Sequence, residues 1–371
     1  MSILQDTELI SEGETEILVF KKKNSKKGPG SKDKVPFYNP SMELNRDLSI
    51  LLNQWIIDNS KMNINILDGL AASGIRGIRL ANELQGDFDV TINDWNEDAY
   101  NLIKKNIKKC KLKNVIAVKK NLNTLLSDMK FHYIDIDPFG SPVYFVDSAI
   151  RSIYNNGIIA CTATDTATLC GVYPNVCLRR YGAKPFHSHV MHETGLRILL
   201  GFLCRESTKY DKGIEPLICY STDHYFRVYI KVKKGVNNAN KSAGNMKYVT
   251  SKELFSPMID TTNIGPLWLG KIENKKMIHE LIPYVFNKKF NTRGELLKLF
   301  ELLENEADAS PFFYTTDNLS SLFKKSPPRL SHIIEKLKKK GYDVSKTHFS
   351  KNGFKTNSSI EEIEDIFKQK N

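Results

Sequence analysis

The sequence lacks several features that would place it in other protein classes. No apolar run among its 371 residues is long enough to cross a membrane, and the polar stretch Met1 to Glu16 lacks the basic-then-apolar order of a signal peptide. It has only six cysteines, and none form a Cys-x-x-Cys pair. Such cysteines favour reduced, buried thiols over disulfides or zinc, so we expect no bound metal. These absences predict a cytoplasmic protein without a membrane segment.

The sequence also has fewer acidic than basic residues. Lys and Arg total 54 against 42 Asp and Glu, which gives a net charge of +12. An acidic partner such as nucleic acid explains this excess, although a Lys/Asn-rich compositional bias of the source genome is the alternative. Seven lysines fall in the Gly- and Ser-containing stretch 21–34. This composition predicts a mobile basic loop, which is either a solvated surface loop or an arm that contacts phosphates.

The hydrophobic pattern predicts a Rossmann-like α/β fold. After a strand pair (9–12 and 16–20) and a helix (42–58), β and α patterns alternate regularly, which indicates a parallel, doubly wound sheet. The strands are expected at 65–68, 90–93, 115–119, 133–135 and 157–162, and the helices at 75–84, 97–110 and 143–153. Residues 192–206 predict a further helix, residues 220–233 late antiparallel strands, and residues 235–244 a loop.

A second unit is expected to begin near residue 263. Helical patterns lie at 275–286, 292–305, 317–324 and 328–341, before a short strand and a turn at 351–353. Helices followed by a basic hairpin indicate a winged-helix-like module that contacts RNA. We therefore predict two domains, residues 1–262 and a smaller α+β domain of residues 263–371 that binds RNA.

The first strand of the sheet ends in a loop suited to a nucleoside cofactor. Asp68 begins this loop, and Gly69 and Gly74 let its backbone approach a ligand at the amino terminus of the next helix. Asp94, twenty residues past Gly74, ends the next strand, where a carboxylate grips ribose hydroxyls. A plain tight turn is the simplest alternative. Asn121 and Leu122, at a third strand end, are placed to contact an adenine edge.

This donor pattern fits either a dinucleotide or S-adenosylmethionine. The loop lacks the close Gly-x-Gly pair that a pyrophosphate requires. Asp68 also stands where a carboxylate could meet the cationic amino group of a methionine moiety. Both features favour the methyl donor.

The acceptor pattern is the triplet Asp137-Pro138-Phe139, directly after a buried strand. A carboxylate can accept from an exocyclic amine, the proline makes the turn rigid, and the ring offers a stacking face. Phe37 lies between two prolines and could supply a second ring, or could belong to the core.

Together these motifs resemble the S-adenosylmethionine-dependent amino methyltransferases. The order of further runs across nearly the whole chain resembles the tRNA (guanine-26-N2) dimethyltransferase family. Those runs are Phe37-Tyr38-Asn39-Pro40, Asn45-Arg46-Asp47, Ala163-Thr164-Asp165-Thr166-Ala167, Leu169-Cys170-Gly171, His192-Glu193, Leu196-Arg197 and Gly265-Pro266-Leu267-Trp268-Leu269-Gly270.

The resemblance implies transfer of one and then a second methyl group to N2 of a tRNA guanine. We expect the protein to act as a monomer. It implies that Asp137 is the acid, that Pro138 offers its backbone carbonyl, and that Phe139 and Phe37 hold the guanine. It further implies cofactor contacts by Arg46, Arg76, Asp94, Asn121 and Leu122. Asn121 stands where relatives usually place an acid, and its amide oxygen can still accept from adenine.

Two rival functions remain at this point. One is an amino methyltransferase that acts on DNA or another RNA, and the other is a non-catalytic RNA-binding protein. The intact Asp137-Pro138-Phe139 triplet argues against the second. Two further groups of residues are expected outside the site. The histidines His187, His189 and His192 are expected to have a structural role near Arg197. A second group either contacts the RNA backbone or forms a solvated face, and it consists of Arg179, Arg180, Tyr181 and Lys184.

Overall fold

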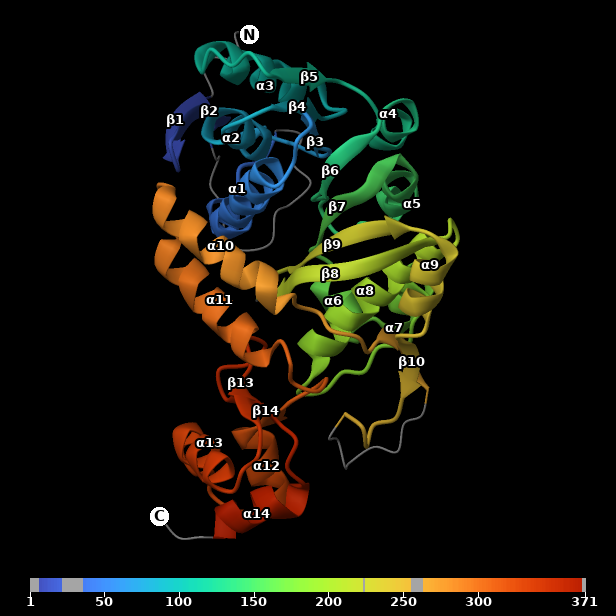
Figure 1. Ribbon diagram of the computed structural model, residues 1–371, viewed down its shortest axis with the longest axis vertical. Coiled ribbons are helices and arrows are strands. Elements are labelled where there is room, and N and C mark those ends of the chain that lie inside the picture. Colours follow the sequence, from blue (N-terminus) through green and yellow to red (C-terminus); the bar gives the residue numbers. More distant parts are fainter. Residues whose placement is uncertain (1–6, 22–35, 223, 255–262, 369–371) are drawn as a thin grey trace.

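The computed structural model describes residues 7–21, 36–222, 224–254 and 263–368 (Figure 1). The predicted basic loop therefore lies outside the described residues except for Lys21. Within the described ranges, no helix is both long and apolar enough to span a membrane.

A seven-stranded sheet forms the centre of the protein, in the order β5-β4-β3-β6-β7-β9-β8. The first five strands in this order are parallel, and β9 runs antiparallel to its neighbours β7 and β8. Antiparallel strands were predicted at 220–233, but β8 already begins at Lys212. The strand order reverses between β3 and β6, and ligands bind at such a switch point in open α/β sheets. The bounds are β3 (Ile64–Asp68), β4 (Phe88–Asn93), β5 (Val115–Val118), β6 (Phe131–Ile136), β7 (Ile153–Ala163), β8 (Lys212–Ser221) and β9 (Phe226–Lys234).

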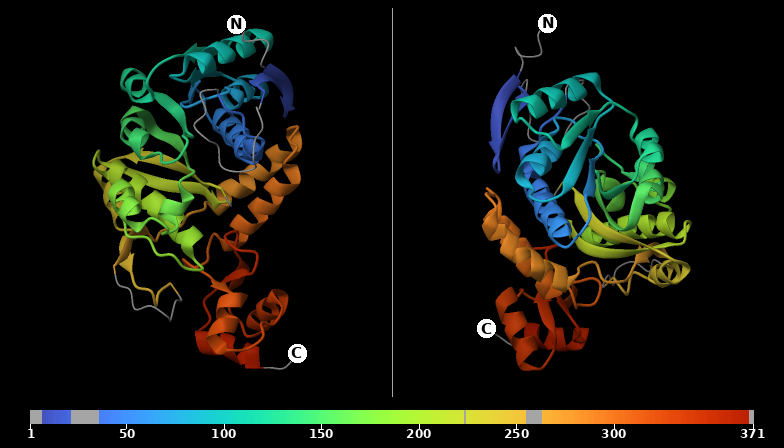
Figure 2. Two further views of the ribbon diagram at one scale, coloured as in Figure 1. Left: turned by 180° about the vertical axis from the view of Figure 1, so that it is seen from behind. Right: turned by 45° about the horizontal axis from the view of Figure 1, so that its top comes forward.

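Helices cover both faces of the sheet (Figures 1 and 2). Alternate residues of one strand point to opposite faces. Accordingly, Ile134 belongs to the core cluster under α4, α5 and α8, whereas Tyr133 belongs to the cluster under α1, α2, α10 and α11. The bounds are α1 (Glu43–Asp58), α2 (Ile75–Glu83), α3 (Glu97–Lys109), α4 (Leu122–Asp128), α5 (Val143–Ser152), α6 (Thr166–Leu169), α7 (Pro174–Tyr181), α8 (Met191–Thr208), α10 (Lys275–Asn287) and α11 (Arg293–Glu306).

The N-terminal strand pair is confirmed. β1 (Thr7–Glu12) and β2 (Thr15–Phe20) are antiparallel. The backbone of Leu18 exchanges hydrogen bonds of 2.8 and 2.9 Å with the amide of Asn106 on α3. The hairpin is thereby fixed beside the helices of the sheet.

The loop predicted at 235–244 is wrong. Residues Val236–Ala243 form helix α9, which packs against β8. Ser242 Oγ accepts from the Ile214 N–H at 2.9 Å and donates to the Ile214 carbonyl at 3.1 Å. These tertiary contacts outweigh the weak helix propensity of an Asn- and Ser-rich segment. Two strands follow, the antiparallel pair β10 (Met246–Val249) and β11 (Ile264–Trp268).

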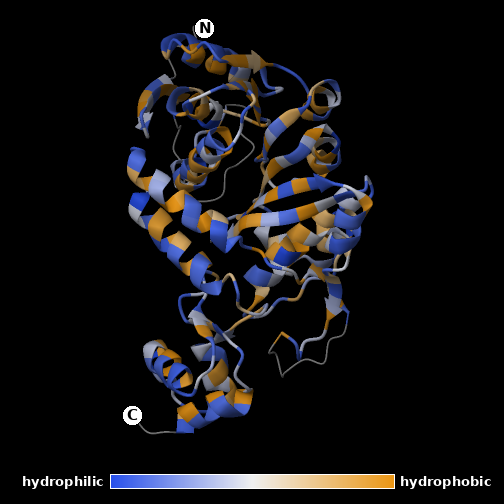
Figure 3. Ribbon diagram, in the orientation of Figure 1, coloured by the Kyte–Doolittle hydropathy of each residue, from blue (hydrophilic) through white to orange (hydrophobic). Residues whose placement is uncertain are grey.

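The smaller C-terminal unit has its own core, formed by residues from Tyr314 to Phe367, and projects from the body (Figure 1). Hydrophobic and hydrophilic residues alternate along its helices, as in amphipathic helices around a small core (Figure 3). In contrast, α10 and α11 share the core of α1. The domain boundary after residue 262 stays a prediction. The elements are β12 (Tyr314–Thr315), α12 (Thr316–Phe323), α13 (Leu330–Lys339), β13 (Val344–Lys346), β14 (Gly353–Thr356) and α14 (Ile360–Lys368).

Candidate active site

A cavity of about 140 Å³ lies at the switch point of the sheet, beyond the carboxyl ends of β3 and β6. It brings together seven residues that the sequence predicts for the site: Phe37, Arg46, Asp68, Arg76, Asp137, Pro138 and Phe139. Thr164, His224 and Tyr225 also line it, and no sequence motif predicted roles for these side chains. The donor loop and the acceptor turn therefore share one cavity.

The donor loop is fixed by Asp94 at the end of β4. The Asp94 carboxylate accepts from the backbone N–H groups of Ala72 at 2.8 Å and Asn96 at 2.9 Å. Burial raises the pKa of Asp94, and these hydrogen bonds oppose that rise. Gly74, with a φ of +78°, caps α2 where an added Cβ would lie 2.7 Å from Ile103. Each Asp94 oxygen keeps a lone pair for a ribose hydroxyl.

Asp68 is buried at the end of β3. Its Oδ2 accepts from the Gly77 N–H at 2.9 Å. Burial raises the pKa of Asp68 to about 7, against the lowering effect of the Arg76 charge. A cationic ligand group arriving beside Asp68 would favour its ionised form.

Arg76 holds the acceptor acid. Its guanidinium donates to Asp137 Oδ2, to Asn45 Oδ1 at 2.7 Å and to Ser49 Oγ at 2.8 Å. Asp135 lies 3.5 Å away and is itself paired with Arg227 at 2.6 Å. The contact that the resemblance implies between Arg76 and the cofactor is untested, but the structure already assigns this side chain to Asp137.

The acceptor turn is supported by the segment that follows β7. The Gly140 N–H donates to Thr164 Oγ1 at 2.6 Å, and the Thr164 N–H donates to the Gly140 carbonyl at 3.0 Å. Ser141 Oγ donates to the Tyr181 hydroxyl, which donates to Asp165. Tyr181 is fully buried, so its prediction as a residue contacting the RNA backbone is wrong.

Two aromatic rings line the cavity together with Asp137. Phe139 is 48% exposed, and its ring centroid lies 6.1 Å from that of Phe37 at an interplanar angle of 54°. The rings contact each other in a tilted arrangement, which an entering base would replace by stacking.

Three predicted cofactor residues have other contacts in the structure. Arg46 lines the cavity, but it is buried and makes two hydrogen bonds of 2.6 Å to Glu12. Asn121 caps α4 by accepting from the Asn123 N–H at 2.9 Å, and Leu122 packs beside Gly69. Five predicted cofactor residues are not among those that line the described cavity: Gly69, Gly74, Asp94, Asn121 and Leu122.

The histidines near α8 make contacts within the fold. His187 Nδ1 lies 3.0 Å from the Cys170 carbonyl, and His192 Nδ1 lies 3.8 Å from Cys170 Sγ. Next to His192, Glu193 pairs with Arg197 at 2.7 Å. On the neighbouring helix α7, Arg180 pairs with Asp165 at 3.2 Å.

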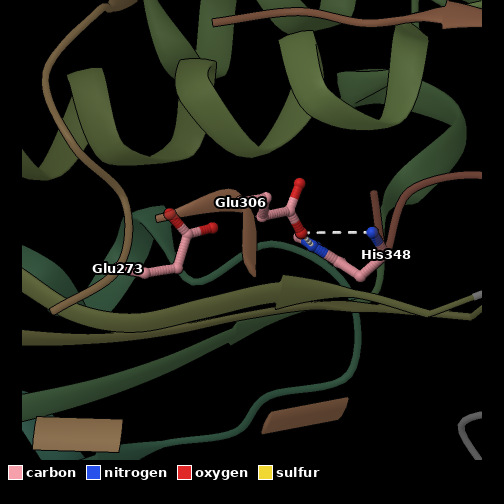
Figure 4. A group of neighbouring side chains, drawn as sticks. All are labelled: Glu273, Glu306 and His348. Carbon is pink, nitrogen blue, oxygen red and sulfur yellow. Dashed lines mark hydrogen bonds and ion pairs between the residues drawn. The ribbon is translucent and has the colours of Figure 1, made fainter. Parts of the chain in front are cut away.

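A second group of buried ionisable residues joins the body to the C-terminal unit (Figure 4). Ligand-type atoms of Glu273, Glu306 and His348 lie within 4.8 Å of one another. His348 Nε2 accepts from the Ser221 N–H at 3.3 Å, so its proton lies on Nδ1, which donates to Glu306. Lys355 lies 3.6 Å from Glu306 and 3.1 Å from Glu193.

The side chains of this cluster balance one another's charges without a metal ion. Glu193 and Glu306 are matched by Arg197 and Lys355. Glu273 adds a third acid, and burial and the Glu306 charge raise its pKa well above the usual range. Glu273 therefore resists ionisation next to the paired acids.

Comparisons with known proteins agree on one family. The family model described as N2,N2-dimethylguanosine tRNA methyltransferase matches residues 13–368. A tRNA (guanine(26)-N(2))-dimethyltransferase of Methanobrevibacter smithii is 39% identical over 358 residues, which cover 91% of this chain and 92% of the relative. The Pyrococcus furiosus enzyme of the same description is 38% identical over 387 residues, covering 97% and 98%.

A solved structure gives the same picture. The complex of Trm1 from Pyrococcus horikoshii with S-adenosyl-L-methionine superimposes with a TM-score of 0.86 at 34% sequence identity. The match covers 96% of this chain and 99% of that one.

Proposed function

The chain belongs to the N2,N2-dimethylguanosine tRNA methyltransferase family, and from the cavity we infer how its side chains perform the reaction. It is a tRNA (guanine-26-N2) dimethyltransferase that transfers one and then a second methyl group from S-adenosyl-L-methionine. One observation carries the assignment of residues. Arg76 holds Asp137 at the wall of a cavity that Asp68, Phe37 and Phe139 also line.

The loop between β3 and α2 fits the methyl donor. Residues 70–73 of this loop line the cavity with Asp68, and Asp94 accepts a hydrogen bond from the loop at Ala72. Asp68 would receive the amino group and Asp94 the ribose hydroxyls. When bound, S-adenosyl-L-methionine supplies a methyl group on a sulfonium, whose sulfur keeps the bonding electron pair as the methyl group leaves.

The acceptor turn would activate guanine N2 by orientation. The lone pair of this amine is delocalised into the ring, so N2 is a poor nucleophile. Asp137 would accept one N–H and the Pro138 carbonyl the other, which directs the lone pair toward the methyl group. Such positioning contributes on the order of several kcal/mol. The N–CH₃ bond forms, and the proton released from N2 passes to Asp137 or to water.

The target base must leave its helix to reach this cavity. Unstacking costs a few kcal/mol, and stacking on an aromatic ring offsets about 1–3 kcal/mol per base. Phe139, about half exposed, and Phe37 are the rings placed to receive the guanine.

A direct assay tests this function. Purified protein is incubated with labelled S-adenosyl-L-methionine and unmodified tRNA transcript, and the nucleosides are analysed by mass spectrometry. Label is expected as N2-methylated and then N2,N2-dimethylated guanosine at tRNA position 26, and a transcript with adenosine at that position should take up none. Label in duplex DNA but not in tRNA would favour the other amino methyltransferases, and no transfer to any substrate would favour a non-catalytic RNA-binding protein.

We further propose that the enzyme is a cytoplasmic monomer and that residues 263–371 form the tRNA-binding domain. The support for the domain is charge, because its basic residues Lys324, Lys325, Arg329 and Lys338 are exposed. Replacing all four by Gln should weaken tRNA binding and flatten its dependence on salt, since each lost phosphate contact removes about 0.7–0.9 from the slope of log K against log salt. An unchanged slope would contradict the domain's role.

A further inference from the structure

Tyr225 is a buried residue that lines the active-site cavity and has no role in the reaction as described above. It lies in the turn between β8 and β9, where its carbonyl accepts from the Thr222 N–H at 2.9 Å and its own N–H donates to Thr222 Oγ1 at 3.3 Å. Tyr225 is 3% exposed, yet it lines the same cavity as Asp137 and Phe139. Its backbone is thus fixed, and the residue forms part of the wall of the substrate space.

The Tyr225 hydroxyl carries a proton without an acceptor. Its ring packs edge-on against Tyr220, with centroids 6.0 Å apart at 73°. Among the described residues, neither hydroxyl has a partner in good hydrogen-bond geometry. Even if Tyr220 donates to Tyr225, the proton of Tyr225 remains unmatched. A buried donor without a partner is costly, and one on a cavity wall indicates a ligand acceptor.

The neighbours of Tyr225 indicate which ligand supplies that acceptor. Burial raises the pKa of Tyr225 to about 12, and the Asp137 charge contributes to the rise, so the hydroxyl stays protonated beside that acid. Asp137 can only accept, and it would meet the N–H groups of guanine. On the same base, N3 and O6 are acceptors that Asp137 cannot read. A hydroxyl donor from a residue of the same cavity wall supplies the missing half of the pattern.

We propose that the Tyr225 hydroxyl donates a hydrogen bond to a ring-edge acceptor of the target guanine, N3 or O6, and is a specificity-determining residue. The proposal rests on the proposed function of the cavity. It involves no proton transfer, because the hydroxyl keeps its proton throughout. Tyr225 would orient the base so that N2 meets the methyl group, and a base without this acceptor would leave the donor unsatisfied.

The first test compares Tyr225→Phe with the matched control Tyr220→Phe. Both remove one buried hydroxyl from the same ring pair, but Tyr220 does not line the cavity. We expect Tyr225→Phe to lower kcat/KM for tRNA about 10–100-fold, at an unchanged dissociation constant for S-adenosyl-L-methionine by calorimetry. Tyr220→Phe should stay within about threefold of the wild type. Wild-type kinetics in Tyr225→Phe, or a loss confined to cofactor affinity, would overturn the proposal.

A second test identifies the acceptor atom. Transcripts carry 3-deazaguanine, which lacks N3, or 2-aminopurine, which lacks O6, at tRNA position 26. The wild type should methylate the analogue that lacks the relevant acceptor more slowly than guanine. Tyr225→Phe should methylate that analogue and guanine at the same rate. If both analogues slow the variant as much as the wild type, Tyr225 contacts neither atom and the proposal fails. In contrast, a wild-type enzyme that leaves guanine 26 unlabelled would refute the proposed function itself.

Discussion

The active-site cavity and the junction with the C-terminal unit contain similar buried clusters of charge. Each has carboxylates held by buried cations: Asp135 and Asp137 by Arg227 and Arg76 in the cavity, Glu193 and Glu306 by Arg197 and Lys355 at the junction. In the cavity, however, the Asp137 side chain keeps 19% of its surface exposed, whereas both junction acids are fully enclosed.

This difference in access separates a reactive cluster from a structural one. Burial alone would raise the pKa of Asp135, but Arg227 and Arg76 lower it below the usual value. In the same way, burial would raise the pKa of Glu306, but His348 and Lys355 lower it to about 2. In both clusters, neighbouring side chains therefore lower the pKa of a buried carboxyl. Because Asp137 has accessible lone pairs and Glu306 does not, only the cavity cluster can bind a substrate.

The largest expected effect comes from removing the accessible charge. Asp137→Asn keeps the shape of the side chain but removes the carboxylate, so kcat should fall about 100–10,000-fold. Cofactor affinity should change little, because Asp137 belongs to the acceptor turn, whereas Tm should fall because buried Arg76 loses its paired carboxylate. Single-turnover methylation and calorimetry measure the two quantities. Asp128→Asn, at an exposed ion pair with Lys120, is the control, and unchanged turnover in Asp137→Asn would remove Asp137 from its role.

Breaking the enclosed cluster should cost stability and leave the chemistry intact. Lys355→Met leaves Glu193 and Glu306 partly unpaired in the interior, which costs about 3–5 kcal/mol of unfolding free energy. Denaturant unfolding measures the loss, and kcat at low temperature should match the wild type. The control Lys340→Met removes an exposed pair with Glu362 and should cost less than about 1 kcal/mol. Equal losses in the two variants would refute the distinction.

An intermediate effect is expected at the donor side of the cavity. Asp94→Ala removes the acceptor of the Ala72 and Asn96 N–H groups and the proposed ribose contact. The dissociation constant of S-adenosyl-L-methionine should rise about tenfold or more, since a lost buried hydrogen bond costs about 1–3 kcal/mol. Asp89→Ala, at an exposed position paired with Asn63, should bind normally. A normal affinity in Asp94→Ala contradicts the ribose assignment.

The smallest effect concerns pH. Burial and Glu306 raise the pKa of Glu273 in the folded protein, so this carboxyl takes up a proton on folding. Its contribution to stability is therefore lost as pH rises above its unfolded value of about 4.3. Glu273→Gln mimics the protonated acid and should raise Tm by a few degrees at pH 8. The gain should shrink toward pH 5, and a gain that is independent of pH would rule out this titration.

The sequence predicted the parts of the site that are local in the chain. Asp68 ends one buried strand and Asp137 directly follows another, and the carboxyl ends of parallel strands meet at one edge of a sheet. Phe37 was predicted from its motif and does line the cavity. Residues whose only signal is spatial were missed. Thr164 belongs to a motif but had no predicted role, and Tyr225 lies in a turn without any motif.

The segment at 236–243 shows the same limit for the fold. Its Asn and Ser residues are typical of loops, and it becomes helical because Ser242 binds the backbone of β8. Intrinsic propensity differs by only fractions of a kcal/mol per residue, so a few tertiary contacts override it.

The strands of the parallel sheet, the donor loop and the acceptor triplet were therefore determined by the sequence itself, because hydrophobic periodicity and strand-end motifs act over short stretches of chain. Only the tertiary structure decided that Arg76 holds Asp137, that Tyr225 faces the same cavity, and that Lys355 closes the junction beside Glu193. These pairings join residues 61 to 162 positions apart, and their energies depend on burial and distance that no local pattern encodes.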